Sequence, residues 1–139
     1  AKFLDQLLAS IGLKREQVYI ANVIKCRPPQ NRDPLPNEIR SCRKWLDHQI
    51  EIIRPKVIVT LGRYSLARYL PHESISKVHG KAQKMGDFIC YPMYHPAAAL
   101  HQNRLREIIE ADMLQIPQVL ARFEGGTEAP VEARQLNLF

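Results

Sequence analysis

The fold is decided by the stretch Lys56-Val57-Ile58-Val59-Thr60-Leu61, which ends at Gly62. A short run of β-branched and apolar residues that stops at a glycine is typical of a strand buried on both faces. Residues 18–23 form a similar run, and residues 88–94 form a third, which is weakened by its proline. We therefore expect about three strands of a central parallel sheet.

Helical patterns alternate with these strands. Apolar residues recur at helical spacing in segment 2–11, and a glycine follows where a helix commonly ends. We expect further helices at 63–70, from His95-Pro96 onward, and from Asn37 until Pro55, the last with an inward face of Ile39, Cys42, Trp45, Leu46, Ile50 and Ile53. Helices and strands in alternation predict an α/β fold, a three-layer αβα arrangement with helices on both faces of the sheet.

The composition fits one globular domain of 139 residues, which we place at residues 1–122. Residues 123–139 contain glycines, a proline and acidic residues, so we expect a flexible tail. No membrane span or signal peptide is recognisable, and we expect a cytoplasmic monomer. The net charge of +6 favours a polyanionic partner, although many basic proteins bind no nucleic acid.

Two of the strands end in polar residues that could carry chemistry, because ligands of open α/β sheets bind beyond the carboxyl ends of the strands. The carboxamide of Asn22 could accept from N3–H of uracil and donate to O4, a polarity that opposes cytosine. His95 precedes a helix N-terminus, where negative charge on a departing base would be stabilised. The plain alternatives are an asparagine that ties down a turn and a surface histidine that caps a strand.

Cys26 and Cys42 flank a basic, proline-rich loop, and their role from the sequence alone is ambiguous. Two cysteines cannot fill the four-thiolate shell of a [4Fe–4S] cluster or a structural zinc site, so a metal site needs two further ligands. Cys90 lies in an apolar strand and is expected to be a small core residue. An odd number of cysteines argues against a disulfide framework.

Several motifs together resemble the family 4, iron–sulfur uracil-DNA glycosylases. The resemblance rests on the run from Asn22 to Arg32, on Pro36-Asn37-Glu38-Ile39 with Cys42, and on Leu61-Gly62-Arg63, His79-Gly80-Lys81 and Tyr94-His95-Pro96. It covers residues 1–120 and is most specific in the first of these motifs. It implies a four-stranded parallel sheet, a [4Fe–4S] cluster, and hydrolysis of the bond between uracil and deoxyribose in DNA.

The resemblance also implies roles for individual residues. Cys26 and Cys42 match the third and fourth cluster ligands, Asn22 the base-reading asparagine, and His95 the histidine that assists the leaving group. The cations Arg27, Arg32, Arg43 and Lys44 could contact DNA phosphates, or could form an ordinary solvated surface. In the family an N-terminal segment supplies two cysteines, a strand, an acidic loop and a base-stacking aromatic residue. None is found here, so we expect an N-terminally truncated sequence that is inactive by itself.

The ending Gln135-Leu136-Asn137-Leu138-Phe139 resembles the short peptides by which bacterial repair proteins dock on the sliding clamp. Of that peptide, Gln135, Leu136, Leu138 and Phe139 would make the contacts. The leading hypothesis is thus a uracil-DNA glycosylase of base excision repair, with uracil-containing DNA and the clamp as partners. The alternatives are a non-catalytic uracil- or DNA-binding module of the same fold, and a zinc-bound structural protein.

Overall fold

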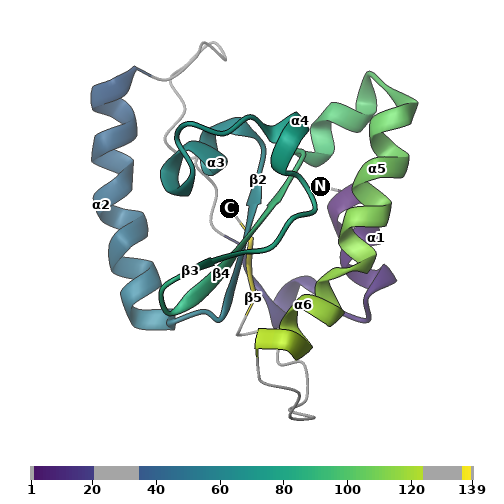
Figure 1. The fold of residues 1–139 in the computed structure, drawn as a ribbon, viewed down its shortest axis with the longest axis horizontal. Coiled ribbons are helices and arrows are strands. Elements are labelled where there is room, and N and C mark those ends of the chain that lie inside the picture. Colours follow the sequence, from purple (N-terminus) through teal and green to yellow (C-terminus); the bar gives the residue numbers. More distant parts are fainter. Residues whose placement is uncertain (1, 21–34, 124–135, 139) are drawn as a thin grey trace.

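The computed structural model describes residues 2–20, 35–123 and 136–138 (Figure 1). In chain order its elements are α1 (Lys2–Ser10), the 3-10 helix η1 (Arg15–Gln17), β1 (Tyr19–Ile20), α2 (Pro36–Ile53), β2 (Val57–Leu61), α3 (Arg63–Tyr69), α4 (Ile75–Val78), β3 (Gln83–Met85), β4 (Phe88–Met93), the 3-10 helix η4 (Pro96–Leu100), α5 (Asn103–Leu114), α6 (Ile116–Phe123) and β5 (Leu136–Leu138). Within these segments, no helix is both long and apolar enough to cross a membrane.

The central sheet has the strand order β1-β5-β2-β4-β3. The first four strands are parallel to their neighbours, and β3 pairs antiparallel with β4. The three predicted strands are confirmed as β1, β2 and β4. Strand β3 was not predicted, because Gln83-Lys84-Met85 lacks a run of β-branched residues; it is the outer arm of a hairpin that turns at Gly86, with φ of 69°.

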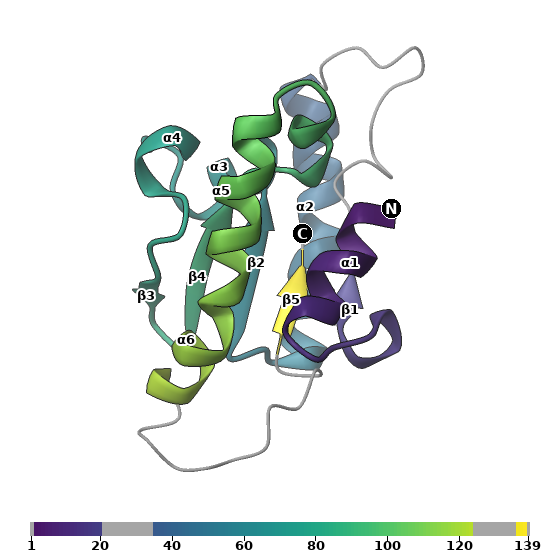
Figure 2. The same ribbon diagram turned by 90° about the vertical axis from the view of Figure 1, so that its right-hand side faces the viewer.

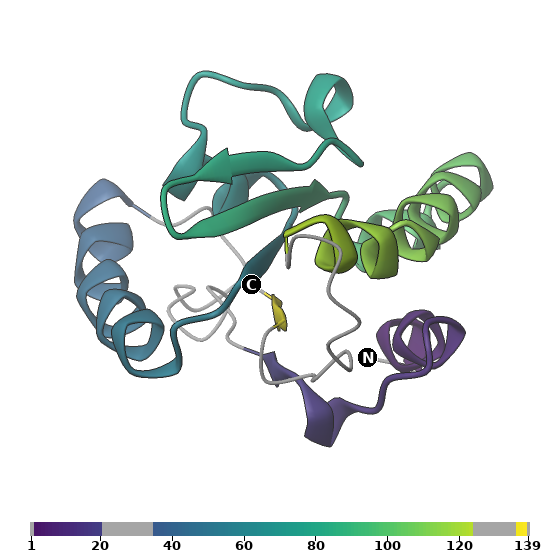
Figure 3. The ribbon, with the colours of Figure 1, turned by 60° about the horizontal axis from the view of Figure 1, so that its bottom comes forward.

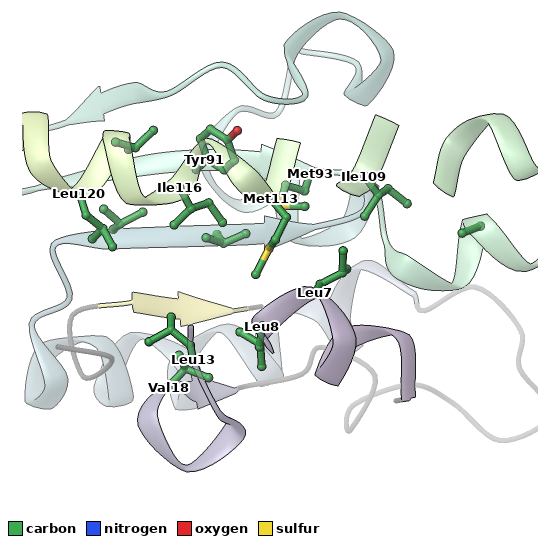
Figure 4. Close-up of a cluster of buried hydrophobic side chains, with 14 residues drawn as sticks. Leu7, Leu8, Leu13, Val18, Tyr91, Met93, Ile109, Met113, Ile116 and Leu120 are labelled. Carbon is green, nitrogen blue, oxygen red and sulfur yellow. The ribbon is translucent and has the colours of Figure 1, made fainter. Parts of the chain in front are cut away.

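Side chains of β2 point alternately to the two faces of the sheet, and each face is covered by helices, as the three-layer prediction required. Val57 and Val59 pack in a core with residues of α1, α5 and α6 (Figure 4). Ile58 points the other way, toward Leu46 of α2 and Tyr69 of α3. Figures 2 and 3 show α1, α5 and α6 on one side of the sheet and α2 on the other.

Three predictions about individual segments need correction. Trp45 does not face inward but is 43% exposed, because the buried stripe of α2 centres on Leu46, one residue and about 100° away. The helix expected from His95-Pro96 is a 3-10 turn, and α5 begins only at Asn103. Within the expected tail of 123–139, α6 reaches Phe123 and Leu136–Leu138 form β5, so these three residues are part of the sheet.

Candidate active site at the carboxyl edge of the sheet

His95 lies just beyond the carboxyl end of β4 and caps η4. Its Nδ1 accepts a hydrogen bond from the backbone N–H of Ala97, at 3.0 Å. Because Nδ1 acts as the acceptor, the proton of the neutral ring is on Nε2. The imidazole is therefore held as a donor through Nε2, which is the polarity needed to stabilise a carbonyl oxygen that gains negative charge.

Gly62 places the end of β2 directly against His95. Its N–H donates to the carbonyl of Met93 at 2.9 Å, which extends the β2–β4 pairing by one residue. Its φ is 87° and its ψ is near 180°, a combination that is almost restricted to glycine. A Cβ at this position would lie 3.2 Å from Cβ of His95, so the histidine occupies the space that a side chain would need.

The proposed base-reading residue, Asn22, lies outside the described residues, as do Cys26, Arg27 and Arg32. Strand β1 ends at Ile20, two positions earlier, and it runs parallel to β5, β2 and β4. The carboxyl ends of β1 and β4 are therefore at the same edge of the sheet. They are three strand spacings apart, which corresponds to roughly 14 Å at about 4.8 Å per spacing.

Cys42 lies in the first half of α2, and its side chain is not among those described. In the described part of the chain, no three His, Cys, Asp or Glu side chains are grouped closely enough to hold a metal ion. Cys90 is confirmed as a core residue: it is fully buried, and burial raises the pKa of its thiol to about 11. It is thus a neutral thiol at physiological pH and not a ready ligand or nucleophile.

The first half of α2 exposes Arg43 and Lys44, the two predicted DNA-contacting cations that lie on this helix, and also Arg40. The spacing of these three residues puts them on one side of the helix. Since α2 leads into the amino end of β2, its own N-terminal half lies at the carboxyl edge of the sheet, the same edge as His95 (Figure 1). Arg40 was not predicted, because it lies two positions before Cys42, whereas Arg43 and Lys44 follow that cysteine directly.

Leu100 is a second feature that sequence reasoning missed. It ends the turn that His95 caps, and it is 78% exposed, the highest value among the exposed large apolar side chains of the described residues. Leu100 lies four positions after the buried Pro96, a spacing that in an α-helix would put both residues on the same buried side. The sequence pattern therefore did not indicate that Leu100 is exposed. Single exposed apolar residues are common, but Leu100 belongs to the same short turn as His95, so it is a candidate for contact with a ligand that His95 binds.

A family model for the uracil DNA glycosylase superfamily matches residues 1–115. The chain belongs to this superfamily. The matched region contains α2, Gly62 and His95, and it ends before β5. The similarity therefore includes α2, Gly62 and His95 at the carboxyl edge described above, whereas β5 lies outside the matched residues.

Individual uracil-DNA glycosylases are similar to the chain over most of its length. A Type-4 uracil-DNA glycosylase of Sulfurisphaera tokodaii is 48% identical over 129 residues, 85% of this chain and 58% of the relative. Type-4 enzymes of Archaeoglobus fulgidus and Thermotoga maritima are 45% and 44% identical, covering 87% and 79% of this chain and 65% and 60% of the relatives. The chain thus spans about three fifths of the length of these relatives.

Proposed function

We propose that the protein is a uracil-DNA glycosylase that hydrolyses the N-glycosidic bond of deoxyuridine in DNA, releases uracil and leaves an abasic site. The observation that carries the proposal is the fixed polarity of His95, whose Nδ1 is occupied by the Ala97 N–H. The names of the relatives, Type-4 uracil-DNA glycosylases, support the same reaction.

The role of His95 follows from where charge develops. As the glycosidic bond breaks, the bonding electrons pass to N1 of uracil and spread to its O2, while the sugar becomes oxocarbenium-like. An Nε2–H donor directed at O2 is most favourable when that oxygen is most negative, so it lowers the barrier more than it strengthens ground-state binding. Water then adds to C1′ of the sugar, and the uracil anion takes up a proton.

Uracil would be recognised by Asn22, whose carboxamide complements N3–H and O4 of the base and opposes cytosine. The parallel arrangement of β1 and β4 supports this role, since it puts the carboxyl ends of both strands at one edge of the sheet. The estimated 14 Å between the strand ends is of the order needed for two side chains with a pyrimidine between them.

Access to the base requires that the nucleotide leaves the duplex, which costs a few kcal/mol. Leu100 is suited to fill the vacated position in the base stack, because it is an exposed apolar side chain on the turn that His95 caps. The cations Arg40, Arg43 and Lys44 would hold the backbone phosphates, together with Arg27 and Arg32. Extrusion of the nucleotide and binding of the phosphates would then both take place at the carboxyl edge of the sheet.

Cys26 and Cys42 would be two of the four ligands of a [4Fe–4S] cluster, as in the family that the sequence resembles. The donor set of this chain does not fit a complete cluster, because two thiolates leave two of the four positions unfilled. We therefore assign the cluster no part in the reaction. Its expected contribution is to brace the loop between Cys26 and α2, and iron analysis with visible absorption of the purified protein would test for it.

Docking on a bacterial-type sliding clamp through Gln135, Leu136, Leu138 and Phe139 is a further part of the proposal. Leu136 and Leu138 lie in β5, hydrogen-bonded between β1 and β2. One peptide cannot be in the sheet and in the apolar pocket of a partner at the same time, so clamp binding would require β5 to leave the sheet. Calorimetric titration of the clamp with the protein and with the isolated peptide tests this, since we expect the free peptide to bind more tightly.

The decisive experiment for the activity compares His95→Leu with the parent in the full-length protein. We expect single-turnover release of uracil to fall by about a hundredfold, as when one donor to a developing anion is removed, with little change in DNA affinity. His72→Leu, at an exposed histidine after α3, is the matched control and should cleave normally. DNA binding without any uracil release by the parent would contradict the proposal and indicate a non-catalytic binding module.

A further inference from the structure

Among the described residues, Asp112 is the only charged side chain that is buried, with 6% of its surface exposed. It lies on α5, and its Oδ2 is 2.7 Å from Nδ1 of His79, in the turn after α4. Burial raises the pKa of Asp112, and the hydrogen bond and charge of His79 oppose that shift. A buried carboxylate is unfavourable unless it is paired, so the interaction with Asp112 holds the imidazole of His79 in place.

Backbone from the turn after α4 and the side chain of Tyr91 pack closely around Asp112. Gly80 has φ of 71°, and a Cβ there would clash with Oδ1 of Asp112. Its N–H donates to the carbonyl of Pro92 in β4, at 2.8 Å. The hydroxyl of Tyr91, the preceding residue of β4, donates to the backbone carbonyl of Asp112 at 2.6 Å. The turn, α5 and β4 are therefore tied together around one carboxylate.

From this pair a chain of contacts leads to His95. The imidazole of His79 packs against the ring of Tyr94, with the ring centroids 5.0 Å apart and the planes tilted by 39°. Tyr94 is the residue between the end of β4 and His95. The end of β4 is also fixed from two sides, because Gly80 binds the carbonyl of Pro92 and Gly62 binds that of Met93.

We propose that His79 is a positioning residue of the glycosylase site: Asp112 holds the imidazole of His79 against Tyr94, and this contact fixes the position from which His95 meets the departing base. The inference rests on the proposed role of His95. It adds two residues, from the turn after α4 and from α5, that need not touch the DNA. If His79 had only a structural role, the hydrogen bonds of β4 would be enough to hold the strand. A positioning role requires both the imidazole ring of His79 and its hydrogen bond to Asp112.

Two variants of the full-length protein separate these requirements. His79→Asn keeps an N–H donor for Asp112 but loses the ring, and His79→Phe keeps a ring against Tyr94 but loses the donor. Tyr91→Phe is the matched control, because it removes the bond to the carbonyl of Asp112 without touching His79. All three should lower the melting temperature, so the rate and the state of His95 distinguish them.

We expect both His79 variants to release uracil about tenfold more slowly in single turnover, with DNA affinity within about twofold of the parent. The ¹⁵N resonance of His95 Nδ1 should shift, since its hydrogen bond to Ala97 depends on the place of the ring, whereas Tyr91→Phe should keep the parent rate and resonance. Parent-like rates and resonances in both His79 variants would overturn the inference. If His95→Leu is fully active, the proposed role of His95 fails. In that case only the ¹⁵N resonance of His95 Nδ1 in the His79 variants tests whether His79 positions the ring of His95.

Discussion

Replacing Gly62 with alanine tests how closely His95 must be placed. The new Cβ would meet Cβ of His95 at 3.2 Å, so one of the two must move by a few tenths of an ångström. If a displacement of 1 Å costs about a hundredfold in rate, a shift of this size corresponds to about three- to tenfold. The backbone at φ of 87° and ψ near 180° adds strain of about 1–3 kcal/mol for any residue with a side chain.

The matched control is Gly12→Ala, at the turn after α1. Gly12 also has a positive φ, of 78°, but a Cβ there would have no atom within 4 Å. Both variants should therefore lose stability in thermal or urea unfolding, and only Gly62→Ala should slow uracil release, measured in single turnover on a labelled oligonucleotide at a temperature where both are folded. If Gly62→Ala releases uracil as fast as Gly12→Ala, the contact with His95 does not control the reaction.

Three further predictions concern the core and the surface. Burial raises the pKa of Asp112 in the folded protein above its ordinary value of 3.8, so its contribution to the free energy of unfolding is complete below pH 3.8 and is lost as pH rises through the folded pKa. Asp112→Asn should remove this dependence on pH. Urea unfolding should therefore show the variant becoming more stable relative to the parent as pH rises from 3.8 through the folded pKa of Asp112. Cys90, with a pKa of about 11, should resist iodoacetamide at pH near 8 in the native protein and react after unfolding, as mass spectrometry can show; modification of the native protein would contradict its burial. Replacing Arg43 and Lys44 with alanine should weaken DNA binding and lower the salt dependence of the affinity by about two phosphate contacts, whereas Lys84→Ala on β3 should change neither.

Much of the fold could be predicted because its signals are local. Strand β2 is a continuous apolar run that ends at a glycine, and α2 ends before Pro55. The α/β class and the parallel sheet followed from the alternation of such segments. Strands β3 and β5 could not be found in this way, because Gln83–Met85 and Leu136–Leu138 are too short to carry a pattern and exist through their partners in the sheet.

The candidate site shows the same division. His95 could be singled out, since a histidine before a proline at a strand end is visible in the sequence. The tautomer of its ring depends on the Ala97 N–H, and the role of Gly62 depends on the approach of a second strand. The pair of His79 and Asp112 was beyond prediction because it joins residues from different elements, and only the folded chain brings them together.

The position of β5 also has a consequence for how the chain assembles. In the part of the chain that the structure describes, β1 and β2 do not pair with each other, and Leu136–Leu138 lie between them. The place between β1 and β2 is therefore filled late in synthesis, after α5 and α6 have already been made. Because contacts between distant segments slow folding, we expect the unit of β2, β4 and α5 to form first and α1 with β1 to be recruited last.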